Sequence, residues 1–233
     1  MSDAHVRGRL DELGARYDVP SAGIDALARI LELIAEDDTA PTTVLDPARG
    51  VDVHVADSLA GLELPAVRAA TTIADLGAGA GFPGLALAAA LPGARVFLVE
   101  SVGRKCAFME RAIAAAGLPN ASVVCARAEE WDGLTDVVTA RALAPLAVIA
   151  EYAAPLLRVG GSLVAWKGAR DAEEEADGAV AAAELGLDVA EVRRVTPFAG
   201  IAERHLYLYS KVSDTPYRFP RRPGMARKRP LGR

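Results

Sequence analysis

A run of glycines follows a short apolar stretch in residues 71–84, Thr-Thr-Ile-Ala-Asp-Leu-Gly-Ala-Gly-Ala-Gly-Phe-Pro-Gly. Gly77, Gly79 and Gly81 let the backbone turn sharply and approach a ligand closely, because no Cβ stands in the way. The helix expected after them presents free N–H groups in its first turn. A second apolar stretch ends at Glu100, where a βαβ unit would place an acid against a ribose diol. This arrangement predicts a pocket for a nucleotide cofactor.

Two templates fit these glycines. The spacing Gly79-x-Gly81-x-x-Gly84 matches the dinucleotide pattern. The spacing Asp75-x-Gly-x-Gly-x-Gly81 resembles instead the first motif of class I S-adenosylmethionine methyltransferases. A carboxylate at Asp75 would repel a pyrophosphate, but it suits the ammonium group of a methionine moiety. The acid therefore favours S-adenosylmethionine over NAD or FAD, and a glycine turn that binds nothing is the remaining alternative.

The composition indicates one domain with an additional segment at an end. The chain has 233 residues, of which 52% are apolar, enough for a sizeable core. No apolar run reaches the roughly eighteen residues that a membrane span needs, and the first residues do not resemble a signal peptide, so we expect a cytoplasmic protein that binds no membrane. Cys106 and Cys125 lie on different expected elements without metal-type spacing. A disulfide and a metal site are therefore both unexpected.

Charge is distributed unevenly along the chain. The net charge is −5, yet residues 211–233 carry eight Lys or Arg and one acid, for a sum of +7, while residues 1–210 sum to −12. A basic segment on an acidic body suggests a patch for a polyanion, and Tyr217 and Phe219 among its arginines suit base stacking. The alternative is a disordered solubilising tail. The candidate RNA contacts are Arg218, Arg221, Arg222, Arg227, Lys228 and Arg229.

The order of expected elements favours an α/β fold. Residues 8–35 read as helices and 37–50 as a connector, after which short apolar strands alternate with helices. The expected strands are 73–76, 96–99, 123–125, 137–139, 162–166, 187–195 and 205–211. We predict a Rossmann-like, mostly parallel seven-stranded sheet with an antiparallel last strand, an ending typical of class I methyltransferases. The proposed parts are an N-terminal helical region with connector (1–64), a methyltransferase domain (65–212) and a basic tail (213–233).

The segment after the fourth strand, residues 139–145, often specifies the methyl acceptor. It has neither the Asn/Asp-Pro-Pro-Tyr/Phe motif used on exocyclic amines nor the cysteine needed for attack on a pyrimidine carbon. Guanine N7 has an in-plane lone pair and no proton, so its methylation needs alignment and exclusion of water but no general base. Arg141, Lys167 and Arg204 are candidates for positioning the target or its phosphates, although Arg141 could instead form a salt bridge across the rim.

Short motifs along residues 54–231 together resemble one family, the 16S ribosomal RNA guanine-N7 methyltransferases, also called glucose-inhibited division protein B. The motifs are His54-x-x-Asp57-Ser58-Leu59, the loop ending Phe82-Pro83-Gly84, Glu100-Ser-x-x-Arg104-Lys105, Arg127-Ala-Glu-Glu130, Ala140-Arg-Ala142, Trp166-Lys-Gly168, Glu203-Arg-His-Leu206 and the tail from Tyr217 to Leu231. The chain departs from the family at residues 40–45, where an Asn-Leu-Thr stretch is usual, and at Val53, where Arg is frequent.

The resemblance implies methyl transfer from S-adenosylmethionine to a guanine N7 in the 530 loop of 16S rRNA. It places cofactor contacts at Gly77, Phe82, the pair Ala128–Glu129 and Arg141, with Glu100 at the ribose. Together with the loop residues, the predicted cofactor site comprises Asp75, Gly77, Gly79, Gly81, Phe82, Glu100, Ala128, Glu129 and Arg141. The alternatives are a small-molecule S-adenosylmethionine methyltransferase, an NAD-dependent oxidoreductase and an RNA-binding factor without catalytic activity.

Overall fold

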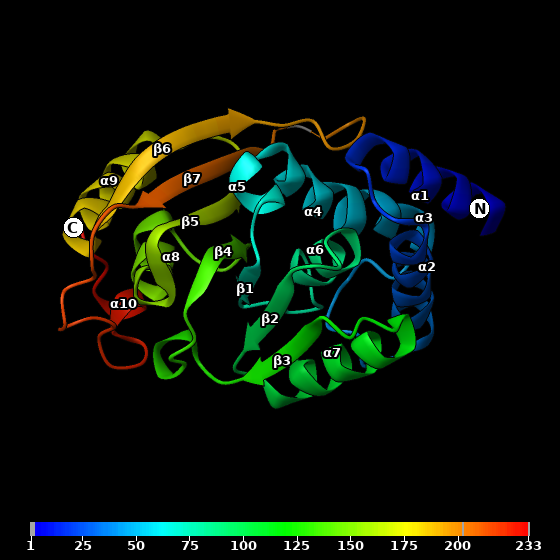
Figure 1. Ribbon diagram of the computed structural model, residues 1–233, viewed down its shortest axis with the longest axis horizontal. Helices are drawn as coiled ribbons and strands as arrows, with labels where there is room; N and C mark the ends of the chain where they lie inside the picture. The colour runs from blue at the N-terminus through cyan, green and yellow to red at the C-terminus, as the bar shows by residue number, and fades with distance from the viewer. Residues whose placement is uncertain (1–2, 202, 233) are drawn as a thin grey trace.

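The computed structural model describes residues 3–201 and 203–232, which fold around one seven-stranded sheet of order β3-β2-β1-β4-β5-β7-β6 (Figure 1). Its strands are β1 (Thr72–Leu76), β2 (Arg95–Glu100), β3 (Ala121–Cys125), β4 (Thr135–Arg141), β5 (Leu157–Lys167), β6 (Leu187–Arg194) and β7 (His205–Lys211). β1 to β5 pair in parallel, and β7 is antiparallel to both β5 and β6. The predicted fold class is confirmed, including the antiparallel last strand.

The helices lie in two layers, one on each face of the sheet. They are α1 (Asp3–Tyr17), α2 (Ser21–Glu36), α3 (Pro47–Gly50), α4 (Asp57–Leu59), α5 (Pro65–Arg68), α6 (Gly84–Ala90), α7 (Gly103–Ala116), α8 (Leu146–Ala153), α9 (Ala172–Leu185) and α10 (Met225–Lys228). Successive strand residues point to opposite faces, so Ile73 joins a core with α1, α2, α4, α6 and α7, whereas Ala74 joins a core with α8, α9 and α10. The N-terminal region therefore shares one core with the sheet.

The segment expected as a connector, residues 37–50, ends in helix. Asp46 accepts a hydrogen bond from the N–H of Ala48, and Pro47 is the first residue of α3. An Asp at the N-cap followed by a Pro favours the start of a helix. α3 leads directly into a π-helical turn, η1 (Val51–Ala56), and then into α4. This continuous helical run carries His54 and Asp57 toward the carboxyl ends of the strands, where both contact residues of the site described below.

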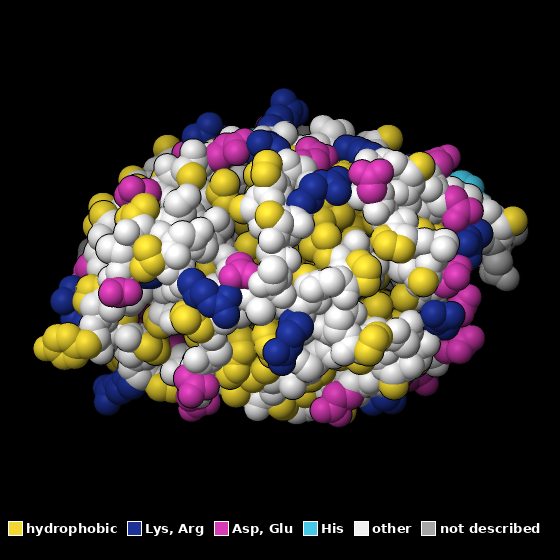
Figure 2. Space-filling model, in the orientation of Figure 1, with side chains coloured by type: hydrophobic (Ala, Val, Ile, Leu, Met, Phe, Trp, Pro, Cys, Tyr) yellow, Lys and Arg dark blue, Asp and Glu magenta, His cyan; other side chains and the backbone are white. Residues whose placement is uncertain are grey.

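The basic tail is folded against the body. Its Phe219 and Ala226 are buried in the core beside α8, and Arg221 forms an ion pair with Glu151, whose side chain is 1% exposed. The alternative of a disordered tail is thus wrong for residues 213–232. Figure 2 shows basic side chains on the surface over the region where Figure 1 draws the C-terminal segment in red. No helix in the described part of the chain is long and apolar enough to cross a membrane.

Candidate cofactor and acceptor site

The glycine loop has the backbone conformation that its composition predicts. Gly77, Gly79 and Gly81 have φ values of +64°, +61° and +96°, a region that other residues rarely adopt. A Cβ on Gly77 would lie 2.5 Å from Leu143 Cδ1, so a side chain at this position would collide with the loop after β4. The N–H of Gly77 donates to the carbonyl oxygen of Val99 at 2.8 Å, which ties the loop to the end of β2.

Asp75 supports this loop from behind. Its carboxylate is fully buried and accepts hydrogen bonds from the N–H of Gly84 at 2.8 Å and from Thr139 Oγ1 at 3.0 Å. Burial raises the pKa of Asp75 to about 6. The side chain lines neither of the cavities described below. The structure therefore places Asp75 where it joins β1, β4 and the start of α6, and not at a surface that a methionine ammonium could reach.

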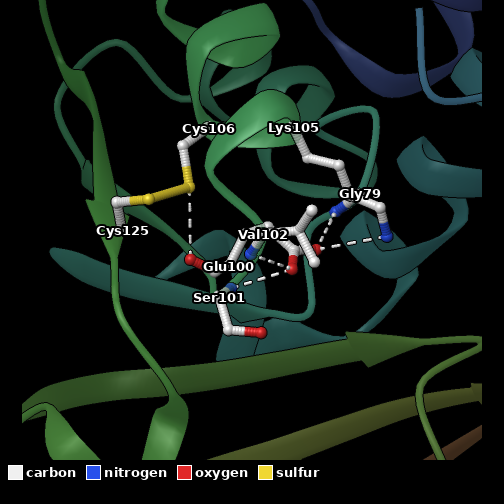
Figure 3. Close-up of a disulfide and its surroundings, with 7 residues drawn as sticks. All are labelled: Gly79, Glu100, Ser101, Val102, Lys105, Cys106 and Cys125. Carbon is white, nitrogen blue, oxygen red and sulfur yellow. Dashed lines mark hydrogen bonds and ion pairs between the residues drawn. A yellow bond between two sulfur atoms is a disulfide. The ribbon is translucent and has the colours of Figure 1, made fainter.

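Glu100 stands at the end of β2 with its carboxylate held by the backbone (Figure 3). Oε1 accepts from the N–H of Ser101 at 2.8 Å and of Val102 at 3.0 Å, and Oε2 accepts from the N–H of Gly79 at 3.3 Å. Lys105 Nζ lies 3.6 Å from Oε2. A carboxylate oxygen has lone pairs beyond these contacts, so the fixed group can still accept hydrogen bonds from a ribose diol.

A cavity of about 330 Å³ opens beside Glu100. Its walls come from the loop after β1, the end of β2, the turn after β3, the loop after β4 and the tail. Among its lining residues are Gly77, Glu100, Lys105, Ala128, Glu129 and Arg227. The structure thus brings together the predicted residues from three separate strand ends. Sequence reasoning missed Lys105, although the quoted Arg104-Lys105 pair lies only one helical turn beyond Glu100.

The tail forms one wall of this first cavity. The N–H of Gly224 donates to Glu129 Oε1 at 3.0 Å, and Arg227 Nη2 donates to the carbonyl oxygen of Leu143 at 2.9 Å. Arg227 was predicted as an RNA contact, but its guanidinium lies at the cofactor cavity and is bonded within the chain. Tyr152, on α8, also lines the cavity and was not predicted.

A second cavity of about 240 Å³ adjoins the first. Gly77, Lys105 and Ala142 line both cavities, so the two meet at these residues. Gly79 and Phe82, predicted as cofactor contacts, line the second cavity only, while Gly81 lines neither and instead shapes the turn. The remaining lining residues of the second cavity are Pro41, Thr42, His54, Ala78, Ala80 and Arg141.

Arg141 is held by Asp57, a carboxylate with 1% exposure. Arg141 Nη1 donates to Asp57 Oδ2 at 2.8 Å and to the carbonyl oxygen of Val53 at 3.0 Å. Arg204 Nε lies 2.7 Å from Asp57 Oδ1, and Trp166 Nε1 donates to the backbone oxygen of Asp57 at 2.8 Å. The salt bridge considered for Arg141 is therefore present. It is compatible with a part in binding, because Arg141 lines the second cavity as well.

Lys167 is already paired within the chain. Its Nζ lies 2.5 Å from Glu174 Oε1 and donates to the carbonyl oxygen of Ala144 at 3.3 Å. Both partners lie on the side of the sheet covered by α8 and α9, and Lys167 lines neither cavity. Of the three positioning candidates, Arg141 and Arg204 are brought together on Asp57, and Lys167 is not.

The expectation that Cys106 and Cys125 form no disulfide is wrong. A disulfide joins them, with Cα atoms 5.8 Å apart, and so links α7 to the end of β3 (Figure 3). The two cysteines meet because Cys125 pairs with Glu100 across the parallel strands, while α7 begins just after Glu100 and runs back over the sheet. Cys106 Sγ lies 3.3 Å from the backbone oxygen of Glu100. The bridge therefore lies next to the backbone of Glu100, which lines the first cavity.

The fold, the glycine loop and the acid at the end of β2 define a class I methyltransferase. The first cavity fits S-adenosylmethionine, because it combines the close backbone approach at Gly77 with the fixed carboxylate of Glu100. Residues 30–207 match the family model described as GidB, rRNA small subunit methyltransferase G. The chain belongs to this family, and it is an S-adenosylmethionine-dependent methyltransferase.

Relatives that carry the name ribosomal RNA small subunit methyltransferase G support this assignment. One from Rubrobacter xylanophilus is 43% identical over 187 residues, covering 76% of this chain and 72% of the relative. One from Symbiobacterium thermophilum is 36% identical over 246 residues, covering 99% of this chain and 100% of the relative. The similarity to the Symbiobacterium protein therefore extends over the N-terminal region and the tail as well as the sheet.

Solved structures with low sequence identity share the fold. The antibiotic-resistance methyltransferase Kmr superposes with a TM-score of 0.52 at 19% identity, covering 62% of this chain and 88% of Kmr. Aeropyrum pernix fibrillarin, in complex with natively bound S-adenosyl-L-methionine, superposes with a TM-score of 0.51 at 19% identity, covering 66% of this chain and 72% of fibrillarin.

Proposed function

We propose that this protein transfers a methyl group from S-adenosylmethionine to N7 of a guanine in the 530 loop of 16S rRNA, in the cytoplasm. The observation that carries the proposal is the chemistry of the second cavity, which contains no carboxylate and no thiol among its described lining residues. Exocyclic amines are methylated with the help of the Asn or Asp of the Asn/Asp-Pro-Pro-Tyr/Phe motif and pyrimidine carbons with a cysteine, whereas guanine N7 needs no such group. The names of the relatives, which specify the RNA of the small subunit, support the same substrate.

The reaction requires the protein to align the methyl donor with guanine N7 and to exclude water. When bound, S-adenosylmethionine would supply a methyl group on a sulfonium sulfur: the in-plane lone pair of N7 would form the new bond as the carbon–sulfur bond breaks, S-adenosylhomocysteine would leave, and no proton would have to be removed. The backbone at Gly77 and the Glu100 carboxylate would hold the methyl donor in the first cavity. Phe82 and Arg141 line the second cavity, on the side of the methyl acceptor. The guanine ring becomes cationic as it is methylated. Asp57 offsets the positive charge of Arg141 and Arg204 nearby, which reduces the repulsion of that cation.

The tail supplies candidate contacts to the RNA phosphates. Arg218 pairs with Glu184, Arg221 with Glu151, and Arg227 with a backbone oxygen. Three further cations have side chains without a partner in the described part of the chain: Arg222, Lys228 and Arg229. In the sequence they are close to the tail residues that form a wall of the first cavity. We therefore assign phosphate contacts first to these three cations, which a polyanion can reach without breaking an internal bond.

The proposal is tested with 16S rRNA and small subunits from a strain that lacks the modification. The protein is incubated with labelled S-adenosylmethionine and either substrate, and the RNA is digested and analysed by mass spectrometry. We expect 7-methylguanosine at one position in the 530 loop. A methylated product at another base or atom, or binding of S-adenosylhomocysteine without any methylated RNA, would overturn the proposal.

A further inference from the structure

We propose that the second cavity receives the acceptor guanine as a single base turned out of its RNA stack, and that His54 reads that base. The inference rests on the proposed function, which it extends by naming the acceptor subsite and the residues that form it. The cavity is lined by Thr42 and His54 from the N-terminal region and by Phe82 and Arg141 from the loops after β1 and β4.

The position of the cavity suits an acceptor. It meets the first cavity at Gly77, Lys105 and Ala142, so a group in one lies next to a group in the other. Ala142 has φ of +52°, a conformation that non-glycine residues adopt rarely. This backbone turns the chain immediately after Arg141, and at this position the side chain is only the methyl group of Ala142. A methyl group can therefore pass between the cavities without meeting a large side chain at Gly77 or Ala142.

The walls of the cavity suit a flat aromatic ring. The rings of His54 and Phe82 are stacked with centroids 5.0 Å apart and an interplanar angle of 12°. The Arg141 guanidinium lies 5.9 Å from the centroid of the Phe82 ring. Unstacked RNA bases stack on the outer faces of aromatic rings and guanidinium planes such as these. The deep, narrow major groove of an RNA helix hides N7, so the base has to leave the helix to reach a buried methyl donor.

His54, which lines this cavity, has an unpaired hydrogen-bond acceptor. Its Nε2 lies 3.2 Å from the carbonyl oxygen of Val44 and 3.3 Å from Thr42 Oγ1. A carbonyl only accepts, so Nε2 carries the proton and Nδ1 keeps a lone pair. Nδ1 is buried with no hydrogen-bond partner in the described part of the chain, and the side chain is 6% exposed. Burial lowers the pKa of His54, which favours this neutral form.

The Watson–Crick edge of guanine supplies the missing partner. Guanine presents N–H donors on that edge, whereas adenine presents an acceptor at the corresponding ring nitrogen. With N7 turned toward the junction, the Watson–Crick edge faces the opposite wall of the cavity, and His54 Nδ1 accepts from it. A buried acceptor that adenine leaves unpaired costs binding energy, and this gives discrimination between the two purines.

Two substitutions distinguish a role of His54 in recognising the base from a purely structural role. His54→Gln can keep the donor at the Nε2 position and its bond to Val44, but it loses the acceptor at Nδ1. His54→Asn does the reverse, since its amide oxygen can occupy the Nδ1 position. We expect His54→Gln to lower kcat/KM for the unmodified small subunit by roughly ten- to a hundredfold and His54→Asn to lower it less. Asp52→Asn, in the same helical turn but outside both cavities, is the matched control and should retain activity.

A bulkier residue at Ala80 tests the cavity itself. Ala80 lines the second cavity and not the first, so Ala80→Leu should fill the acceptor site. We expect calorimetry to show S-adenosylhomocysteine affinity within about threefold of the wild-type value, while methyl transfer falls by at least a hundredfold. Loss of cofactor affinity as well would mean that the loop collapsed in this variant. The comparison of His54→Gln with His54→Asn then tests the acceptor site.

The outcomes separate this inference from the proposed function. If the wild-type protein forms 7-methylguanosine but His54→Gln is as active as His54→Asn, or Ala80→Leu is fully active, the acceptor site lies elsewhere and the function stands. A larger loss in His54→Asn than in His54→Gln assigns His54 a structural part and also overturns the inference. If the wild-type protein methylates no guanine, both proposals fail together.

Discussion

The N–H of Gly224 donates a hydrogen bond to Glu129 Oε1 at 3.0 Å, joining residues 95 positions apart in the chain. Glu129 belongs to the turn after β3 that lines the cofactor cavity, and Gly224 immediately precedes α10 in the basic tail. The tail is thus part of the wall around the cofactor. Under the proposed function, RNA would contact the tail and the cofactor would lie beside Glu129, so both ligands would act on the same segment.

Two arginines of the tail should affect different ligands when they are removed. Arg227→Ala deletes a bond to the backbone of Leu143 at the first cavity, so we expect S-adenosylhomocysteine affinity to fall about five- to tenfold. Arg222→Ala removes a cation without an internal partner, so it should leave that affinity unchanged and reduce the salt dependence of RNA binding. Calorimetry with S-adenosylhomocysteine and filter binding of RNA at several salt concentrations measure the two effects. Equal cofactor affinities in the two variants would contradict the assignment of Arg227 to the cavity.

The ion pair between Arg221 and Glu151 should anchor the tail. Glu151 is 1% exposed, so Arg221→Ala leaves a buried carboxylate without its partner, and we expect the free energy of unfolding to fall by about 3 kcal/mol. Arg218→Ala removes a pair between side chains that are 58% and 36% exposed, so it should cost at most about 1 kcal/mol.

Urea unfolding of both variants and of Arg221→Ala combined with Glu151→Leu checks this explanation. The double variant should recover most of the loss, because it leaves no unpaired charge in the core. If it is as unstable as Arg221→Ala alone, the cost comes from lost packing and not from the charge.

The sequence was sufficient for those parts of the site that depend on local pattern. Gly77 and Glu100 each directly follow or end a short apolar strand, and parallel strands bring their carboxyl ends to one edge of a sheet. The turn at Ala128–Glu129 could be placed by the same reasoning. The position of these residues at one edge of the sheet follows from strand order, so it did not require knowledge of how the side chains pack.

The missed features depend on packing between distant segments. Arg141 and Arg204 share Asp57 because η1 and α4 carry Asp57 over the strand ends. No spacing in the sequence indicates that Asp57 lies beside these two arginines. The basic composition of the tail led to the prediction of RNA contacts, but it could not reveal that Arg227 lines the first cavity and bonds to the backbone of Leu143. His54 was visible only as part of a motif, since its unpaired Nδ1 is a property of the folded chain.

The disulfide between Cys106 and Cys125 should stabilise the protein measurably. It closes a loop with a sequence separation of 19 residues, for which restriction of the unfolded chain gives about 3 kcal/mol. Cys125→Ser should therefore lower the free energy of unfolding by about that amount relative to the oxidised wild type. Urea unfolding with and without dithiothreitol provides the control, because reductant should destabilise the wild type and leave Cys125→Ser unchanged. Identical curves for the wild type in both conditions would show that the bridge does not contribute.

The buried carboxylate of Asp75 should make stability depend on pH in a narrow range. Its pKa is about 6 in the folded protein and 3.8 when unperturbed, so the folded state keeps its proton over an interval in which the unfolded state has lost it. The contribution of Asp75 is fully present below pH 3.8 and is lost as the pH rises through about 6, a change of about 3 kcal/mol. Asp75→Asn cannot ionise and can still accept from the N–H of Gly84.

The comparison of the two proteins isolates this group, because all other titrating side chains are shared. We expect the variant to gain stability relative to the wild type as the pH rises from about 4 to 7, and the difference to stay constant above that range. Urea unfolding at several pH values measures the difference directly. A difference that does not change with pH would mean that the Gly84 and Thr139 hydrogen bonds fully compensate the burial of the charge, and that Asp75 is ionised throughout.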